Sequence, residues 1–189
     1  MLSVIIPTDG VERTAVATLT ALVPGASAGV IREVLLVDRA GNGVIERVAD
    51  VAGCHYLACE GSRAAAMAAG ARQARGPWLM FLHAGAVLDP GWIDETTQFI
   101  QNVSLSEKPR AGIFRYARSP YADTGLREGL RSLGRMMSGP SADQGLLIAR
   151  DHYERLGGYA PEARHAEARL LRRLGRSSRT LLRSRIVVA

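Results

Sequence analysis

Polar and charged side chains stand directly after the apolar segments in the first half of the chain, and their types are suited to binding a nucleotide. An acid at the end of a strand can receive ribose hydroxyls or a base edge, which makes Asp38 a candidate. An arginine in the first turn of a helix can bind a diphosphate with the help of the positive end of that helix, which makes Arg63 a candidate. The ordinary alternatives are that Asp38 caps the following loop and that Arg63 lies on the surface. The full set of candidate nucleotide-binding residues is Pro7, Thr8, Asp9, Asp38, Arg39, Arg63 and His83.

Alternating strands and helices are expected to position these residues. The short apolar runs over residues 2–7, 33–38, 55–59 and 78–83 are typical of strands buried on both faces. Helical spacing predicts helices over residues 11–22, 44–51, 62–75 and 90–103. Pro24-Gly25 is expected to end the first of these helices, and Ser62 to cap the third. The small residues of the third helix would let its backbone pack closely on the sheet.

The second half of the chain is less regular. Strands are predicted over residues 112–118, 145–149 and 181–188, and helices over residues 125–137 and 161–174. No repeat or linker divides the chain, so we expect one domain over residues 1–189. Its halves are a nucleotide-binding half, 1–103, and a second half, 104–189, with an arginine-rich C-terminal helix. The predicted fold class is α/β, a Rossmann-like and mostly parallel sheet flanked by helices, with ligands at the carboxyl ends of its strands.

Composition excludes several classes of protein. The 189 residues are 47% apolar and 22% charged, which is typical of a globular domain and excludes a disordered or collagen-like chain. No apolar run reaches the roughly 18 residues of a spanning helix. The N-terminus has no basic region followed by a cleavage site, so no signal peptide is expected and a cytoplasmic location is predicted. Cys54 and Cys59 are then expected to be reduced thiols.

The charge balance is basic and rests almost wholly on arginine. The net charge is +6, and Lys108 is the only lysine. Residues 164–185 hold eight arginines and one acid, Glu167, a pattern that fits either a solvated helix face or a surface for phosphate or an anionic membrane. No aromatic residue stands between these arginines, so nucleic acid is not an expected partner. The segment 125–137 could pack on its own domain, on a second copy of the chain or on a membrane surface.

Several segments together resemble one enzyme family. SVIIPT at 3–8 and EVLLVD at 33–38 resemble the start of a family 2 glycosyltransferase of the GT-A fold. Residues 61–92 resemble a short bacterial branch of that family, in which a Gly-Arg segment opens an alanine-rich helix and the next strand ends in His-Ala-Asp. Residues 142–159 resemble the acceptor-side segment of the family, and residues 166–175 its final helix. The order and spacing of these segments carry the resemblance over about residues 1–175.

The resemblance implies an activity and its machinery. Family members transfer a sugar from a nucleoside diphosphate sugar, here expected to be UDP- or GDP-linked, to an acceptor hydroxyl with inversion at the anomeric carbon. A divalent metal, Mg²⁺ or Mn²⁺, neutralises the departing diphosphate, and a carboxylate takes the acceptor proton. By this resemblance Asp143 and Gln144 line the acceptor side, and Asp143 and Glu167 are the catalytic candidates.

The sequence departs from the family pattern at three points. Gly85 stands where the branch has its metal-binding Asp, so the expected metal ligand is missing. Asp9 and Glu12 stand near the usual Asn-Glu, and Glu167 is a displaced base, one methylene longer than the usual Asp. In the ordinary alternative, Glu167 is a surface ion-pair partner and His83 a strand-end residue with a satisfied hydrogen bond.

Two hypotheses about function follow from these departures. The first is a transferase with little or no metal dependence, in which Arg39 and Arg63 replace the cation. The second is a catalytically degenerate relative that binds a nucleotide, a sugar phosphate or a protein partner without turnover.

Overall fold

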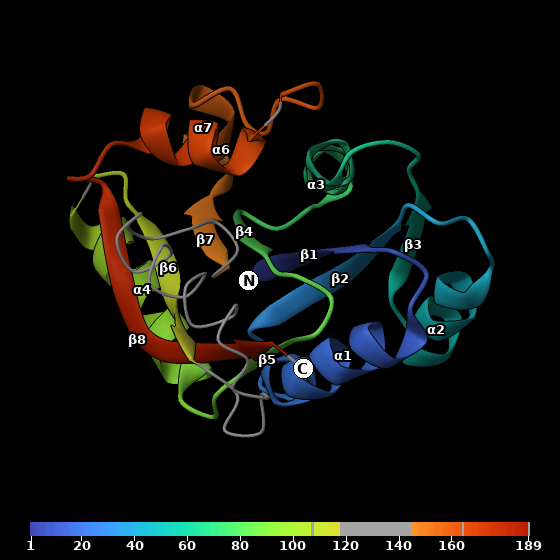
Figure 1. The fold of residues 1–189 in the computed structure, drawn as a ribbon. Helices are drawn as coiled ribbons and strands as arrows, with labels where there is room; N and C mark the ends of the chain where they lie inside the picture. The colour runs from blue at the N-terminus through green and yellow to red at the C-terminus, as the bar shows by residue number, and fades with distance from the viewer. Residues whose placement is uncertain (107, 118–144, 164, 189) are drawn as a thin grey trace, which may run out of the picture.

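The apolar runs of the first half form one end of an eight-stranded sheet in the computed structural model, which describes residues 1–106, 108–117, 145–163 and 165–188 (Figure 1). The four strands are β1 (Leu2–Thr8), β2 (Ile31–Asp38), β3 (His55–Ala58) and β4 (Trp78–Phe81). They lie in the order β3-β2-β1-β4, and each neighbouring pair is parallel, which confirms the predicted βαβ units. The register pairs Thr8 with Asp38 and Asp38 with Ala58, so the carboxyl ends of β1, β2 and β3 meet at one edge.

The second half of the chain makes the sheet mixed. Its strands are β5 (Ala86–Leu88), β6 (Ala111–Ala117), β7 (Leu146–Ala149) and β8 (Arg179–Val188). β7 runs antiparallel to both β4 and β6, β8 runs parallel to β6, and β5 pairs antiparallel with β8. The sequence did not predict β5, because three residues are too few for a strand pattern to be recognised.

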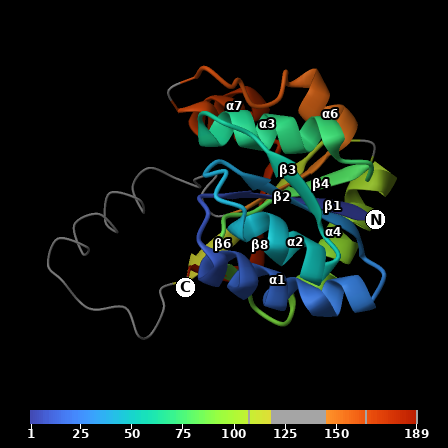
Figure 2. The same ribbon diagram turned by 90° about the vertical axis from the view of Figure 1, so that its right-hand side faces the viewer.

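Helices cover both faces of the sheet (Figure 1, Figure 2). On one face lie α1 (Glu12–Ser27), α2 (Val44–Ala52) and α4 (Trp92–Ser106), and on the other lie α3 (Arg63–Gln73), α6 (Arg150–Arg155) and α7 (Ala166–Leu174). Side chains that alternate along β1 serve both layers, with Val4 and Ile6 in one apolar cluster and Ile5 in the other. Among the described residues, no helix combines the length and the apolar character needed to cross a membrane.

The alanine-rich helix α3 packs closely on the sheet, as predicted. A Cβ atom added at Gly70 would lie 2.5 Å from Cγ2 of Ile5 and 3.1 Å from Cγ2 of Val37. Only a residue without a side chain fits at this distance from β1 and β2. The small residues of α3 therefore bring the first turn of the helix close to the strand ends.

Two predicted boundaries were wrong. Helix α1 does not stop at Pro24 but continues to Ser27. A proline removes its own N–H and crowds the preceding turn, but its carbonyl still accepts a hydrogen bond, here from Ala28 N at 2.9 Å. Gly25 also packs against the ring of Trp92, where an added Cβ would lie 2.4 Å from the indole, so packing favours the extended helix. The predicted helix over residues 161–174 begins only at Ala166, and α6 before it was not predicted.

Several arginines of the second half hold helix ends. Arg150 donates to three carbonyl groups around the end of α3, at 2.5 to 3.1 Å. Arg173 donates to Leu156 O at 2.9 Å, just after α6, and Arg179 donates to Leu171 O within α7. Part of the arginine-rich charge therefore satisfies helix carbonyls instead of facing solvent or an anion. The predicted helix over residues 125–137 lies outside the described residues.

Candidate functional site

Thr8 and Asp38 form a buried pair at the edge where the parallel strands end. Thr8 Oγ1 donates to Asp38 Oδ1 at 3.0 Å, and Gly41 N donates to Asp38 Oδ2 at 2.9 Å. Both side chains belong to residues that are 1% exposed. The structure thus places Asp38 as a cap of the loop after β2, which was the ordinary alternative, and its role toward a nucleoside stays a prediction. Pro7 is buried beside this pair and is in register with Val37.

Asp9 and Arg39 follow Thr8 and Asp38 directly in the sequence, and their side chains form an ion pair. Arg39 Nε lies 2.7 Å from Asp9 Oδ1, and Arg39 Nη2 lies 2.5 Å from the same oxygen. Arg39 Nη1 also approaches the carbonyl of Gly61, at 3.5 Å. The Asp9 side chain is 69% exposed, so this ion pair lies at the molecular surface. Through its contact with Gly61 O, Arg39 links the end of β2 to the N-terminus of α3.

Arg63, His83 and Glu167 come together from three elements far apart in the sequence. Arg63 begins α3, His83 follows β4, and Glu167 stands in the first turn of α7. Arg63 Nε lies 3.6 Å from Glu167 Oε1, and both side chains are about one third exposed, at 34% and 27%. Arg63 Nη2 is hydrogen-bonded to His83 Nε2.

The contact between Arg63 and His83 sets the donor in this pair. An arginine has only donors, so in a hydrogen bond between the two groups Arg63 Nη2 donates and His83 Nε2 accepts. Glu167 places a carboxylate on another side of the same guanidinium.

Ser62 anchors this cluster. Its hydroxyl accepts from Ala65 N at 3.1 Å, which confirms the predicted cap of α3. The same hydroxyl donates to Pro161 O at 2.7 Å, across 99 residues of sequence. It thus fastens the turn that precedes α7 to the start of α3. His165, the residue before α7, has a φ of 150°, which is unusual for a residue with a side chain. The capping pattern revealed Ser62, but no local signal pointed to its second bond.

The turn from His83 to Gly85 is held by α1. Gly85 N donates to two oxygens of α1, Thr14 O at 2.8 Å and Thr18 Oγ1 at 2.9 Å. Thr18 Oγ1 lies 3.2 Å from His83 O. Gly85 has a φ of 93°, in the left-handed region where an aspartate is strained. No local sequence pattern points to Thr18, because it stands in the middle of a helix.

The described residues at this turn do not fit a divalent metal. Gly85 offers no side-chain ligand, and the carboxylate of Asp89, four residues on, accepts from Arg185 N of β8 at 3.0 Å. Within the described ranges, no group of three or more His, Cys, Asp or Glu side chains is placed to hold a metal ion. Asp143 and Gln144, predicted for the acceptor side, lie outside the described residues.

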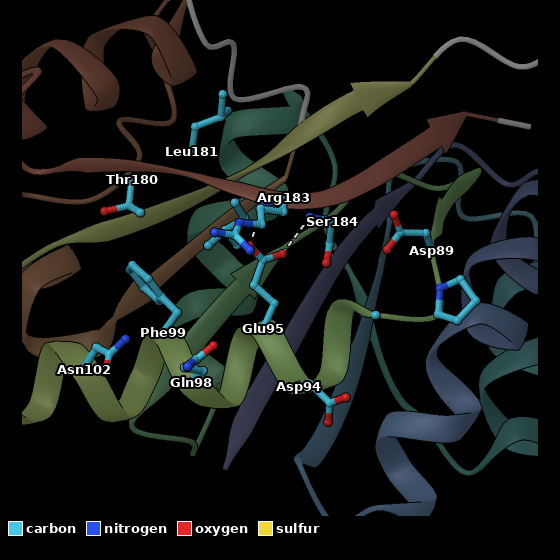
Figure 3. A pocket seen from close by; sticks show the side chains of 13 residues that line it. Asp89, Asp94, Glu95, Gln98, Phe99, Asn102, Thr180, Leu181, Arg183 and Ser184 are labelled. Carbon is cyan, nitrogen blue, oxygen red and sulfur yellow. Dashed lines mark hydrogen bonds between the residues drawn. The ribbon is translucent and has the colours of Figure 1, made fainter.

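A separate groove of about 930 Å³ lies between α4 and β8 (Figure 3). Glu95 on α4 reaches across it, and its two carboxylate oxygens accept from the backbone N–H groups of Arg183 and Ser184. Burial alone would raise the pKa of Glu95, but these hydrogen bonds and the charge of Arg183 outweigh burial and lower the pKa. The pairing between β8 and β6 has its register shift at these residues of β8. Glu95 therefore accepts from backbone N–H groups that lie outside the regular pairing of the two strands.

Comparison with known proteins identifies the fold. No family model matches the chain, and no curated protein sequence does. Among solved structures, the first 349 residues of S. aureus TarS match with a TM-score of 0.71 at 12% identity, over 100% of this chain and 60% of that chain. The chain has the GT-A glycosyltransferase fold.

Two further GT-A structures match this chain over its whole length. Glucosyl-3-phosphoglycerate synthase from Mycobacterium tuberculosis, solved with Mn²⁺, UDP and glucosyl-3-phosphoglycerate, has a TM-score of 0.67 at 16% identity, and 70% of it is covered. The mannosyltransferase PcManGT from Pyrobaculum calidifontis, solved with GDP-Man and Mn²⁺, has a TM-score of 0.66 at 17% identity, and 56% of it is covered. The chain thus spans roughly 56 to 70% of the length of these proteins. Such identities show a shared fold, and membership of family 2 stays a prediction.

Proposed function

We propose that this GT-A protein binds a nucleoside diphosphate sugar at the strand-end site and transfers the sugar to an acceptor hydroxyl with inversion. The observation that carries the proposal is the row of polar contacts that joins the Thr8–Asp38 pair, Arg39 and the N-terminus of α3 with Arg63. A nucleoside diphosphate has ribose hydroxyls followed by two phosphates. In this proposal the ribose lies at Asp38 and the phosphates lie at Arg39 and Arg63. Two of the structural neighbours were solved with UDP and with GDP-Man, so both nucleotides are reasonable donors to test.

The arginines supply the positive charge that the reaction requires. As the acceptor oxygen attacks the anomeric carbon, the bond from that carbon to the diphosphate breaks, and the electron pair leaves with the diphosphate. In this proposal Arg63 and Arg39 bind the developing negative charge in place of a metal. Glu167 takes the proton of the acceptor hydroxyl. Asp143 and Gln144 are proposed to orient the acceptor.

A second candidate is a protein that binds the nucleotide without turnover. Two observations favour it. Gly85 provides no metal ligand in a turn where the backbone itself suits glycine, and Glu167 is already paired with Arg63. In this case the arginines hold the diphosphate and no acceptor is activated.

Calorimetric titration with UDP and with GDP, each with and without Mn²⁺, tests the proposal. We expect micromolar binding of one nucleotide that does not depend on Mn²⁺ and that Arg63→Gln weakens. The absence of binding at millimolar nucleotide would contradict the proposal. Binding without sugar release or transfer, across a screen of UDP- and GDP-sugars with simple acceptors, would favour the second candidate.

A further inference from the structure

We propose that Glu167 is an internal counter-ion of the diphosphate site, and that a diphosphate must displace it from Arg63 in order to bind. This inference rests on the proposed function, because it concerns the same arginine. It adds a role for Glu167 that precedes any proton transfer: it selects which anions the site accepts.

The contacts of Arg63 carry the inference. The guanidinium has its Nη2 on His83 and its Nε 3.6 Å from Glu167 Oε1. Among the described residues, Glu167 is a carboxylate that forms an ion pair with this guanidinium. The hydrogen bond from Ser62 to Pro161 ties the turn before α7 to the start of α3, the two elements that carry Glu167 and Arg63.

A diphosphate and Glu167 compete for one cation. A single guanidinium in a partly exposed site does not neutralise a carboxylate and a diphosphate together, and two anions at one arginine repel each other. A diphosphate brings more negative charge than a carboxylate and can take a bidentate hydrogen bond from the guanidinium. It can therefore displace Glu167, whereas an anion with a single charge gains little over the pair that already exists.

Arg39 shows the same arrangement in a weaker form. Its partner Asp9 is 69% exposed, compared with 27% for Glu167, so solvent screens the Asp9 pair more strongly. We expect Glu167 to be the stronger competitor. In this arrangement, Glu167 leaves Arg63 only when a diphosphate is bound. The carboxylate then becomes available to take the acceptor proton after the donor has bound.

The test uses inorganic pyrophosphate as the probe, so that the identity of the nucleoside does not enter. Calorimetry of the full chain compares the wild type with Glu167→Gln, Arg63→Gln and the control Glu162→Gln. Glu162 is an exposed acid in the turn before α7, so the control makes the same change of charge nearby. We expect Glu167→Gln to tighten pyrophosphate binding about two- to fivefold, as the loss of a partly exposed competing ion pair allows. Glu162→Gln should leave it unchanged, and Arg63→Gln should weaken it.

Orthophosphate gives a second readout that a purely structural role of Glu167 would not move. If Glu167 selects for charge, the ratio of orthophosphate to pyrophosphate dissociation constants changes in Glu167→Gln and not in Glu162→Gln. Glu167→Ala should behave as Glu167→Gln does, and thermal melting verifies that each variant is folded.

Three results would overturn the inference. Equal tightening by Glu167→Gln and Glu162→Gln would indicate a general effect of net charge. Weakening by Arg63→Gln without tightening by Glu167→Gln would leave the diphosphate site in place and remove the counter-ion. A failure of every protein to bind pyrophosphate would also refute it, and the titrations with UDP and GDP would then decide the proposed function separately.

Discussion

At the scale of single residues, the turn after β4 shows why this chain differs from the pattern that its sequence resembles. Gly85 stands where the family that the sequence resembles has an aspartate, and its φ of 93° together with its contacts to Thr14 and Thr18 favours glycine there. The positive charge near this turn is instead carried by Arg63, which His83 and Glu167 hold in place. In the proposed function, Arg63 supplies at this turn the positive charge that a metal would otherwise bring.

Restoring the carboxylate tests this account. Gly85→Asp and Gly85→Ala both place a side chain at a positive φ, so both should lose about 1–2 kcal/mol of unfolding free energy. Only the aspartate adds a ligand, so we expect Mn²⁺ to strengthen nucleotide binding in Gly85→Asp alone, measured by calorimetry at matched Mn²⁺. If the two variants respond to Mn²⁺ alike, a carboxylate at this position does not reach the nucleotide.

At the scale of elements, the helices are positioned by close contacts at their ends. Gly70 lets α3 lie against β1 and β2, and Ser62 ties the start of α3 to the turn before α7. Arg150 binds the carbonyl groups around the end of α3 and so fastens α6 and β7 to it. The position of Arg63 at the start of α3 thus depends on contacts at both ends of that helix.

Removing one of these contacts should cost stability. Arg150→Met leaves carbonyl groups at the end of α3 without a donor, and we expect a loss of about 1–3 kcal/mol in the free energy of unfolding, measured with urea. Arg155→Met is the matched control, because the hydrogen bond of Arg155 to the described part of the chain goes to Asp151 O within its own helix. A loss of equal size in both variants would show that the bonds of Arg150 are not special.

At the scale of the whole molecule, two partly buried carboxylates join neighbouring elements. Glu33 accepts from Ser3 Oγ on β1 and from Arg75 N after α3, both at 2.5 Å, and its pKa is lowered because these bonds and the nearby His55 outweigh the effect of burial. Glu95 does the same between α4 and β8. Acid conditions should therefore weaken the contacts between elements before they affect the apolar core.

The pH dependence of stability follows from the sign of these shifts. The folded pKa of Glu95 lies below its ordinary value of 4.5, so its contribution is complete above pH 4.5 and is lost as the pH falls through the folded pKa. We expect Glu95→Gln to be about 1–3 kcal/mol less stable than the wild type at neutral pH, and the difference to shrink in acid. Urea unfolding at several pH values measures this, with the exposed Asp94→Asn as control. A difference that stays constant with pH would assign the loss to packing.

The sequence determined the parts of this protein that local pattern encodes. Buried runs of β-branched residues predicted the parallel strands, small residues predicted the close approach of α3, and Ser62 signalled a helix cap, because each depends on neighbouring residues and on burial. The tertiary structure decided what depends on distant contacts. These are the antiparallel pairing of β5 with β8 and the continuation of α1 past Pro24. They also include the hydrogen bond from Thr8 to Asp38 and the contacts of Arg63 with His83 and Glu167. Periodicity reports which face of an element is buried but not which element covers it, so these contacts follow only from the packing of the complete fold.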